Sequence, residues 1–165
     1  MRITRALAVL IATAALATAC TQDGSSGTRE WEPDDALQRV QRAFDADDAD
    51  TTLVAEASKF VVSGIDHTLD TPGDKPYRFD IACDTQGVPS ITLTLTRGET
   101  TRTFEVRCGN RQVVRVNVPA GPPVTAKVPS IETEPPPSGV IVWNLSTIEP
   151  TDVQGCPDDI QGCKA

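Results

Sequence analysis

The sequence predicts a mainly β fold: an antiparallel sandwich of seven to eight strands, Ig-like or jelly-roll-like, with one short N-terminal helix. Two observations predict it. From about residue 51 to residue 148, apolar and polar residues alternate with a period of two, and Gly- or Pro-containing turn signals separate the alternating stretches. Such alternation is typical of half-buried strands. Turn signals at intervals of about ten residues are typical of a sandwich or barrel.

The first nineteen residues have the three parts of an export signal. Arg2 and Arg5 are followed by an apolar run over residues 6–16 and then by the small residues 17–19. A membrane-spanning helix needs about 20 apolar residues. This run is about half that length, so we expect a processing signal and no permanent membrane span.

The cleavage site has two interpretations. Ala17, Thr18 and Ala19 fit ordinary signal peptidase cleavage, whereas residues 16–20 resemble the bacterial lipobox, in which Cys20 becomes the lipidated first residue. The usual lipobox has Leu at the position of Ala17, and this chain has its Leu one residue earlier. Without Cys20, an even number of cysteines remains, which suits disulfide pairing in an oxidising compartment. We therefore expect a lipid anchor on Cys20.

A tether and a helix precede the predicted sandwich. Residues 20–30 are polar and rich in Gly and Ser, which is typical of a flexible tether. Within residues 31–50 we expect an amphipathic helix that begins near Pro33 and ends near Asp45, followed by an acidic loop. Spacings of three and four place its apolar residues on one face. These residues are Leu37, Val40, Ala43 and Phe44.

The sandwich itself is expected over residues 51–148, followed by a C-terminal tail over residues 149–165. Period-two strands are predicted around residues 79–83, 91–96, 104–108, 114–118 and 124–128, and a more fully buried strand over residues 140–145. The segment 53–69 has two interpretations. Its Ala-Glu-Ala triplet suits a helix, whereas Phe-Val-Val followed two residues later by Gly suits a strand.

The four remaining cysteines are predicted to form two disulfides. Cys83 and Cys108 share the parity of the apolar residues in their strands, so both are expected to point into the core and to pair. Cys156 and Cys163 enclose a short loop and are paired by proximity, although four cysteines allow three pairings. From the lengths of the loops that they close, we expect the Cys83–Cys108 disulfide to stabilise the fold by about 3.5 kcal/mol and the Cys156–Cys163 disulfide by about 2.5 kcal/mol. A zinc site is not expected, because the sequence has neither a close Cys pair nor a second histidine beside His67.

Charge and motifs argue against several functions. The formal net charge is −8, and removing Arg2 and Arg5 leaves 13 basic against 23 acidic residues, or −10, which disfavours nucleic acid. Ser63, Asp66 and His67 lie close in sequence but lack the signature of a hydrolytic triad, so we expect a surface loop histidine and no catalytic residues. We also predict no metal and no cofactor.

Two further groups of residues are candidate binding sites. The acidic run 45–50, with Glu56 beyond it, resembles a calcium loop only loosely, and we interpret it as a solvated helix end. Aromatic rings are the other candidates for ligand contact. Trp143 has the parity of a core residue, and Trp31 is expected to pack the tether against the domain. Trp143, Trp31 and Tyr77 therefore remain weak ligand-binding candidates.

Four segments, 75–83, 91–96, 106–109 and 139–145, together resemble small uncharacterised lipoproteins of high-GC Gram-positive, actinobacterial-type bacteria. The resemblance implies a disulfide-linked sandwich on the outer face of the cytoplasmic membrane and carries over no catalytic residue. We expect a monomeric, non-enzymatic module of the cell envelope that binds an envelope protein or a cell-wall ligand. A lipoprotein that binds a small ligand or glycan is the alternative, and a hydrolase of unknown type is a further one.

Overall fold

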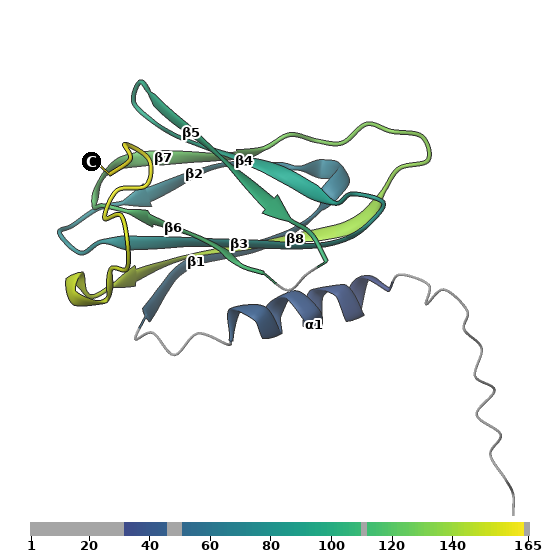
Figure 1. Cartoon of the computed structure of the whole chain (residues 1–165), viewed down its shortest axis with the longest axis horizontal. Coiled ribbons are helices and arrows are strands. Elements are labelled where there is room, and N and C mark those ends of the chain that lie inside the picture. Colours follow the sequence, from purple (N-terminus) through teal and green to yellow (C-terminus); the bar gives the residue numbers. More distant parts are fainter. Residues whose placement is uncertain (1–31, 46–50, 110–111, 164–165) are drawn as a thin grey trace, which may run out of the picture. The chain divides into compact units, whose positions relative to one another are not determined.

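The computed structural model describes residues 32–45, 51–109 and 112–163 (Figure 1). The predicted cleavage site, the tether and Trp31 lie outside this part of the chain. The elements, in chain order, are α1 (Pro33–Phe44), β1 (Thr51–Phe60), the 3₁₀ turn η1 (Val61–Ser63), β2 (Ile65–Thr71), β3 (Tyr77–Gln86), β4 (Ser90–Arg97), β5 (Thr100–Arg107), β6 (Val114–Val118), β7 (Gly121–Val128), β8 (Ser138–Ile148) and the 3₁₀ turn η2 (Pro150–Asp152).

The described strands form two antiparallel four-stranded sheets. One sheet has the order β1-β8-β3-β6, and the other has the order β2-β7-β4-β5. In the first sheet β8 pairs with β1 on one side and with β3 on the other, so β3 and β8 are its central strands. The predicted mainly β fold is thereby confirmed, with α1 as the one α-helix of the described residues.

The core lies between the two sheets and follows the predicted alternation. Phe79 and Ile81 of β3, Leu93 of β4 and Ile141 of β8 are fully buried, and Trp143 is only 3% exposed. Alternate residues of a strand point to opposite faces. The intervening polar residues of β3 and β8 therefore project from the outer face of the first sheet, the face on which α1 lies (Figure 1).

The segment 53–69 is extended over most of its length. Residues of the Ala-Glu-Ala triplet belong to β1 and pair with β8, with Ala55 opposite Leu145 and Ala57 opposite Trp143. Both alanines pack against the core. Helix propensity is a weak preference that tertiary packing overrides. The helical interpretation is therefore wrong for this triplet, which lies in β1. The strand interpretation of Phe-Val-Val is correct only for Phe60, the last residue of β1, because the two valines belong to the 3₁₀ turn η1.

Helix α1 is held on the sheet by a small apolar contact and a two-pronged ion pair. Ala36 and Val40 are buried against Ala82 of β3 and Val140 of β8. Beside them, Arg39 Nε donates to Asp84 Oδ2 at 2.6 Å and Nη2 to Oδ1 at 3.3 Å. The hydrogen bond to Asp84 raises the pKa of Arg39, which keeps the guanidinium charged.

Both predicted cysteine pairings are present. Cys83 in β3 pairs with Cys108, which directly follows β5, so this disulfide joins the two facing sheets with a Cα–Cα distance of 4.7 Å. Cys156 pairs with Cys163 in the tail, with a Cα–Cα distance of 5.4 Å. Both distances lie within the usual range for disulfides.

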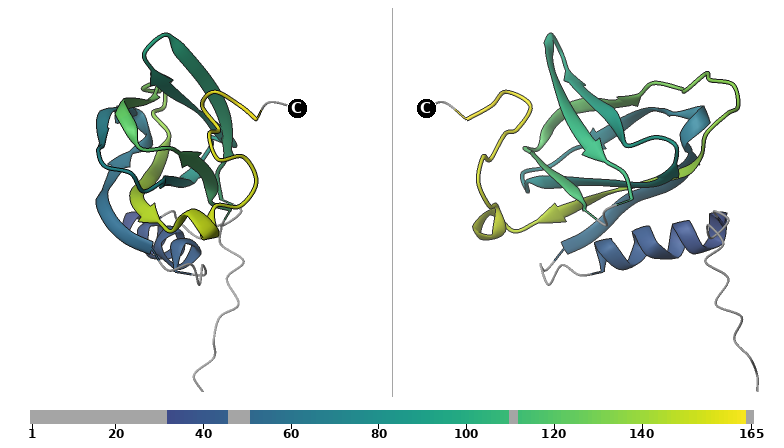
Figure 2. Two further views of the ribbon diagram at one scale, coloured as in Figure 1. Left: turned by 90° about the vertical axis from the view of Figure 1, so that its left-hand side faces the viewer. Right: turned by 45° about the vertical axis from the view of Figure 1, so that its right-hand side comes forward.

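The loop closed by Cys156 and Cys163 covers the side of the sandwich where β5 and β6 are the edge strands (Figure 2). The backbone N–H of Asn117 in β6 donates to Asp159 Oδ2 at 2.7 Å, and the carbonyl oxygen of Asn117 accepts from the Asp159 N–H at 3.0 Å. From β5, Arg102 Nε donates to the carbonyl of Ile160 at 3.2 Å. The fully buried Ile160 side chain belongs to the main core, so the tail contacts both sheets.

Candidate functional site

A hollow of about 570 Å³ opens on the outer face of the first sheet, beside the C-terminal end of α1. It is bordered by α1, by β1 and by the central strands β3 and β8. Its apolar lining residues are Phe44, Leu53, Val142 and Trp143. Its polar lining residues are Gln41, Asp45, Thr51, Glu56, Arg78, Asp80, Asn144 and Ser146.

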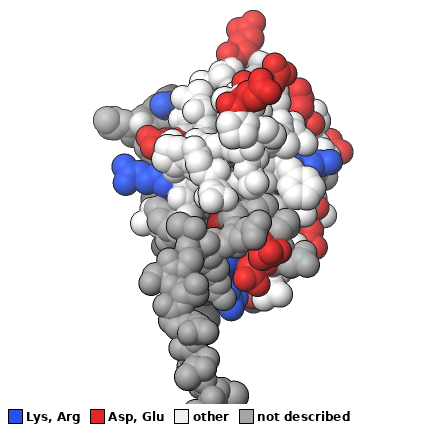
Figure 3. Space-filling view, turned by 90° about the vertical axis from the view of Figure 1, so that its right-hand side faces the viewer, with Lys and Arg blue, Asp and Glu red and all other residues white. Residues whose placement is uncertain are grey.

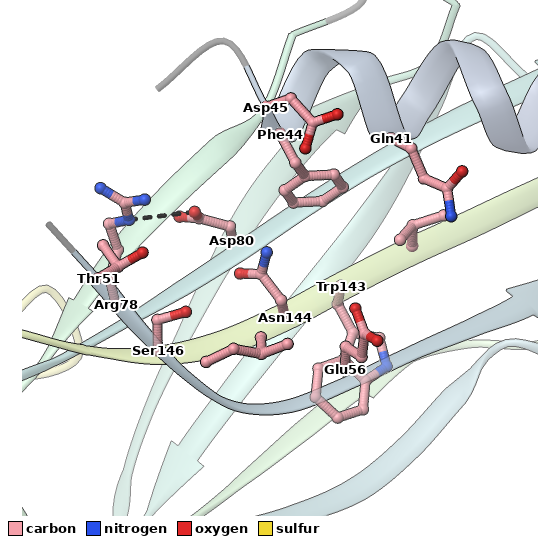
Figure 4. A pocket seen from close by; sticks show the side chains of 12 residues that line it. Gln41, Phe44, Asp45, Thr51, Glu56, Arg78, Asp80, Trp143, Asn144 and Ser146 are labelled. Atoms are coloured by element: carbon pink, nitrogen blue, oxygen red, sulfur yellow. Dashed lines mark hydrogen bonds and ion pairs between the residues drawn. The ribbon is translucent and has the colours of Figure 1, made fainter. Parts of the chain in front are cut away.

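The strand register explains why polar side chains gather at this place. Asp80 of β3 lies directly opposite Asn144 of β8, and Arg78 lies opposite Ser146. These four residues alternate with core positions, so all project from the outer face. Figure 4 shows Asp80, Asn144 and Ser146 on the sheet side of the hollow, with Phe44 and Asp45 on the helix side.

Asp80 is a carboxylate that is only 3% exposed and is flanked by arginines. Arg78 Nε lies 3.1 Å from Asp80 Oδ2, and Arg115 Nε of β6 lies 4.0 Å from Oδ1. A buried charge is stable only when it is paired and hydrogen-bonded. The arginines therefore compensate the charge of Asp80 and hold it as a fixed wall of the hollow.

Asn144 presents a different kind of group. Its side-chain oxygen Oδ1 is buried and accepts no hydrogen bond from the residues that the structure describes. A buried acceptor without a donor costs about 1–3 kcal/mol. Because this oxygen has almost no accessible surface, a donor in the hollow can bond to it only when the Asn144 side chain turns toward the hollow.

The end of α1 contributes negative potential and an aromatic ring. The helix ends at Phe44 with Asp45 as its C-cap, and the Asp45 N–H donates to the carbonyl of Gln41 at 3.1 Å. The C-terminal end of a helix carries a partial negative charge. Because Phe44 and Asp45 both line the hollow, this end of the helix borders it.

The three aromatic residues predicted as weak ligand-binding candidates lie in different environments. Trp143 borders the hollow but is buried, and its ring contacts Phe79 at a centroid distance of 5.7 Å and His67 at 5.1 Å. Tyr77 is 5% exposed and its hydroxyl donates to the carbonyl of Pro72 at 2.7 Å. Trp31 lies outside the described residues.

Ser63, Asp66 and His67, which lie close together in sequence, are spread over two elements. Ser63 ends η1, whereas Asp66 and His67 are neighbours in β2 and therefore point to opposite faces of that strand. Asp66 Oδ2 lies 3.7 Å from Lys127 Nζ. His67 is exposed, as predicted, but it lies in a strand, which corrects the predicted loop position.

The acidic run is described only at its first residue, Asp45, and at Glu56 beyond it. Asp45 and Glu56 both line the hollow, whereas residues 46–50 lie outside the described residues. Across residues 32–45, 51–109 and 112–163, no three His, Cys, Asp or Glu side chains gather as a metal site. Over the same ranges no helix has the length and apolar character that a bilayer span requires.

Strand β1 forms one edge of the first sheet and exposes apolar side chains. Leu53 is 51% exposed, Val54 49% and Phe60 56%. An open edge strand is a template for pairing with another chain. The register of β1 shifts between Leu53 and Ala55, and such bulges interrupt edge pairing. Leu53 also borders the hollow, so edge and hollow are adjacent.

Surface charge is distributed unevenly on the face drawn in Figure 3. Acidic side chains lie at the top, along the right-hand edge and below the centre, basic side chains lie mainly at the two edges, and uncharged residues occupy the upper centre. This view is turned so that the right-hand side of Figure 1 faces the reader. The excess of acidic over basic side chains on this face agrees with the net charge of −8.

No protein-family model matches the chain, and no curated protein matches it in sequence. The geometry of the hollow is therefore the basis for a functional interpretation.

Sequence reasoning did not identify the hollow, although it placed several of its residues. Phe44 was predicted on the apolar face of the helix, and the structure adds that it is only half buried. Asn144 interrupts the apolar run 140–145, and a polar residue in a central strand was the available signal. Asp80 and Arg78 carried no comparable signal, because alternation predicts only that they face outward.

Proposed function

We propose that this protein is a non-enzymatic binding module of the cell envelope, anchored by lipid on Cys20 to the outer face of the cytoplasmic membrane. The hollow beside α1 is its ligand site, and the ligand is a small polar molecule. The polar hollow of about 570 Å³ carries the proposal. Ligand sites are typically concave and lie on rigid elements with a few convergent polar groups.

Three further features support this function. The export signal and the lipobox-like residues 16–20 suit an anchored protein. The disulfides at Cys83–Cys108 and Cys156–Cys163 suit an oxidising compartment. Finally, central strands, one ion-paired carboxylate and a docked helix form the walls of the hollow, so little ordering entropy opposes binding.

Within the β-sandwich class, we assign the domain to the jelly-roll type. Its strand orders are β1-β8-β3-β6 and β2-β7-β4-β5, so the chain passes repeatedly from one sheet to the other. An Ig-like sandwich places sequential hairpin strands side by side more often. Jelly-roll domains serve as binding modules in lectins, which is an analogy of fold and agrees with the proposed function.

The proposal is tested by a titration of the ¹⁵N-labelled mature protein with glucose, glucosamine, N-acetylglucosamine and glucuronate, followed by amide chemical shifts. We expect at least one probe to give saturable shifts at Glu56, Asn144 and Ser146. The substitution Asn144→Val should weaken that binding. The matched control Thr92→Val, on an exposed position of β4, should leave it unchanged.

Two results would contradict the proposed function. One is the absence of saturable shifts around the hollow with all four probes. The other is shifts that cluster elsewhere and are insensitive to Asn144→Val. Spectra of both variants without a probe show whether the fold is retained, so a folding defect is recognised separately.

A further inference from the structure

We infer that the ligand of the hollow carries a protonated amine, such as the ammonium group of an amino sugar. This inference rests on the proposed function and specifies the chemistry of its ligand. Charges at the border of the hollow, the end of α1 and the acceptor on Asn144 all point to a cation that donates hydrogen bonds.

The charge at the hollow is negative. Three carboxylates line it, those of Asp45, Glu56 and Asp80, against one lining cation, Arg78. A second cation, Arg115, lies behind Asp80 at 4.0 Å from its Oδ1, so Asp45 and Glu56 carry the excess negative charge. Arg78 is already engaged by Asp80 at 3.1 Å. Glu56 and Asp45 are both exposed, and neither is ion-paired within the described part of the chain. An anionic ligand is therefore repelled, and a cation gains from two carboxylates.

The position of α1 strengthens the negative potential. Because the helix ends at Phe44, the negative end of its dipole lies at the hollow together with Asp45. Phe44 is half buried and offers part of its ring to the hollow. An ammonium group is attracted to the face of an aromatic ring as well as to a carboxylate.

The hydrogen-bonding groups favour a donor-rich ligand. Asn144 Oδ1 is buried, and the described residues give it no donor. When they are ionised, the carboxylates of Asp45 and Glu56 can accept hydrogen bonds but cannot donate them. An ammonium group supplies three donors and no acceptor, and neighbouring hydroxyls add further donors for Ser146 and Thr51.

The inference is tested with three of the four sugar probes. Glucosamine, glucose and glucuronate share a ring and differ in charge at neutral pH. We expect glucosamine to bind about tenfold more tightly than glucose, which corresponds to about 1.4 kcal/mol, and glucuronate to give no saturable shift at the hollow. Added salt should reduce the preference for glucosamine because it screens exposed carboxylates.

Two matched variants locate the origin of the preference. Glu56→Gln removes one negative charge at the hollow and should lower the preference for glucosamine over glucose to about threefold or less. Asp70→Asn removes an exposed charge from β2, in the other sheet, and should leave the tenfold preference intact.

Each outcome has a defined meaning. Equal affinities for glucosamine and glucose would overturn the cationic ligand while leaving the proposed binding function in place. No saturable shift with any sugar would count against both. Calcium chloride that moves the same amides at micromolar concentration and displaces glucosamine would assign the hollow to a metal ion and overturn the ammonium ligand.

Discussion

At the residue scale, single positions decide whether neighbouring segments can approach. Gly64 joins η1 to β2 with φ 64° and ψ −166°, a combination that side chains with a Cβ avoid. A Cβ at this position would lie 2.8 Å from the backbone nitrogen of Ser130 and would overlap the carbonyl oxygen of Val128. The glycine therefore permits both the turn and the contact with the chain after β7.

Gly64→Ala tests this role. We expect it to lower the free energy of unfolding by about 3 kcal/mol, because the backbone strain and the steric overlap add together. The control is Gly98→Ala, which has a similar φ of 58° but open space around the added Cβ, and which should cost only about 1 kcal/mol. Urea unfolding followed by fluorescence measures both, and equal losses would show that overlap at Gly64 has no effect.

At the element scale, helix α1 is the part of the fold that builds the hollow. Its contact with the sheet is small, comprising Ala36, Val40 and the ion pair from Arg39 to Asp84. The end of the same helix supplies Phe44 and Asp45 to the hollow. Ligand binding should therefore depend on a docked helix even though the sandwich has its own core.

Ala36→Asp tests the helix. Burying a carboxylate at a position that is 0% exposed should undock α1 while the sheets stay folded. Hydrogen exchange should then show lost protection in α1 alone, and glucosamine shifts at the hollow should disappear. The same substitution at an exposed position of the helix, Gln38→Asp, should change neither. Unchanged binding in Ala36→Asp would contradict a role for the helix.

The C-terminal loop is the second element with a defined role. Replacing Cys156 and Cys163 together by Ser should lower the free energy of unfolding by about 2.5 kcal/mol, because the disulfide no longer restricts the unfolded chain. Ile160→Ala should cost about 2–5 kcal/mol, since it removes a fully buried side chain from the core. Thermal and urea unfolding measure both losses. A double Ser variant as stable as the native protein would show that the Cys156–Cys163 disulfide does not stabilise the fold.

Comparison of elements shows what the sequence could predict. Period two located the strands from β3 onward, and shared parity paired Cys83 with Cys108, because both follow from local geometry. The segment 53–69 was ambiguous because Ala55 and Ala57 favour a helix locally, and only pairing with β8 makes them a strand. The hollow depends on the register of β3 against β8 and on where α1 docks, which are long-range properties.

At the scale of the whole molecule, the proposed membrane anchoring and the proposed ligand binding depend on different parts of the chain. Cys20 and the signal lie outside the described residues, whereas the hollow belongs to the sandwich and its helix. Binding by the domain and attachment to the membrane should therefore be separable by mutation.

Cys20→Ser tests the anchor. Cells grown with a radioactive fatty acid should incorporate label into the native protein and none into the variant, because the thiol is the acceptor of the lipid. The variant should be released from the membrane fraction. Equal label in both proteins would remove the proposed anchor and leave ordinary secretion after residue 19.

We also expect the mature domain to be a monomer. The bulge between Leu53 and Ala55 interrupts the exposed edge of β1, and Glu56 and Lys59 place charges on it. Sedimentation equilibrium at micromolar concentration should give the monomer mass. A dimer that Val54→Lys dissociates would show instead that β1 pairs with a second copy.

The most direct test of the central claim is a crystal structure of the mature protein soaked with glucosamine. The account predicts density for the sugar in the hollow, with its ammonium group within hydrogen-bond distance of the carboxylate of Glu56 or Asp45 and a donor on Asn144 Oδ1. A hollow filled by the protein's own side chains, or a sugar bound only elsewhere, would contradict it.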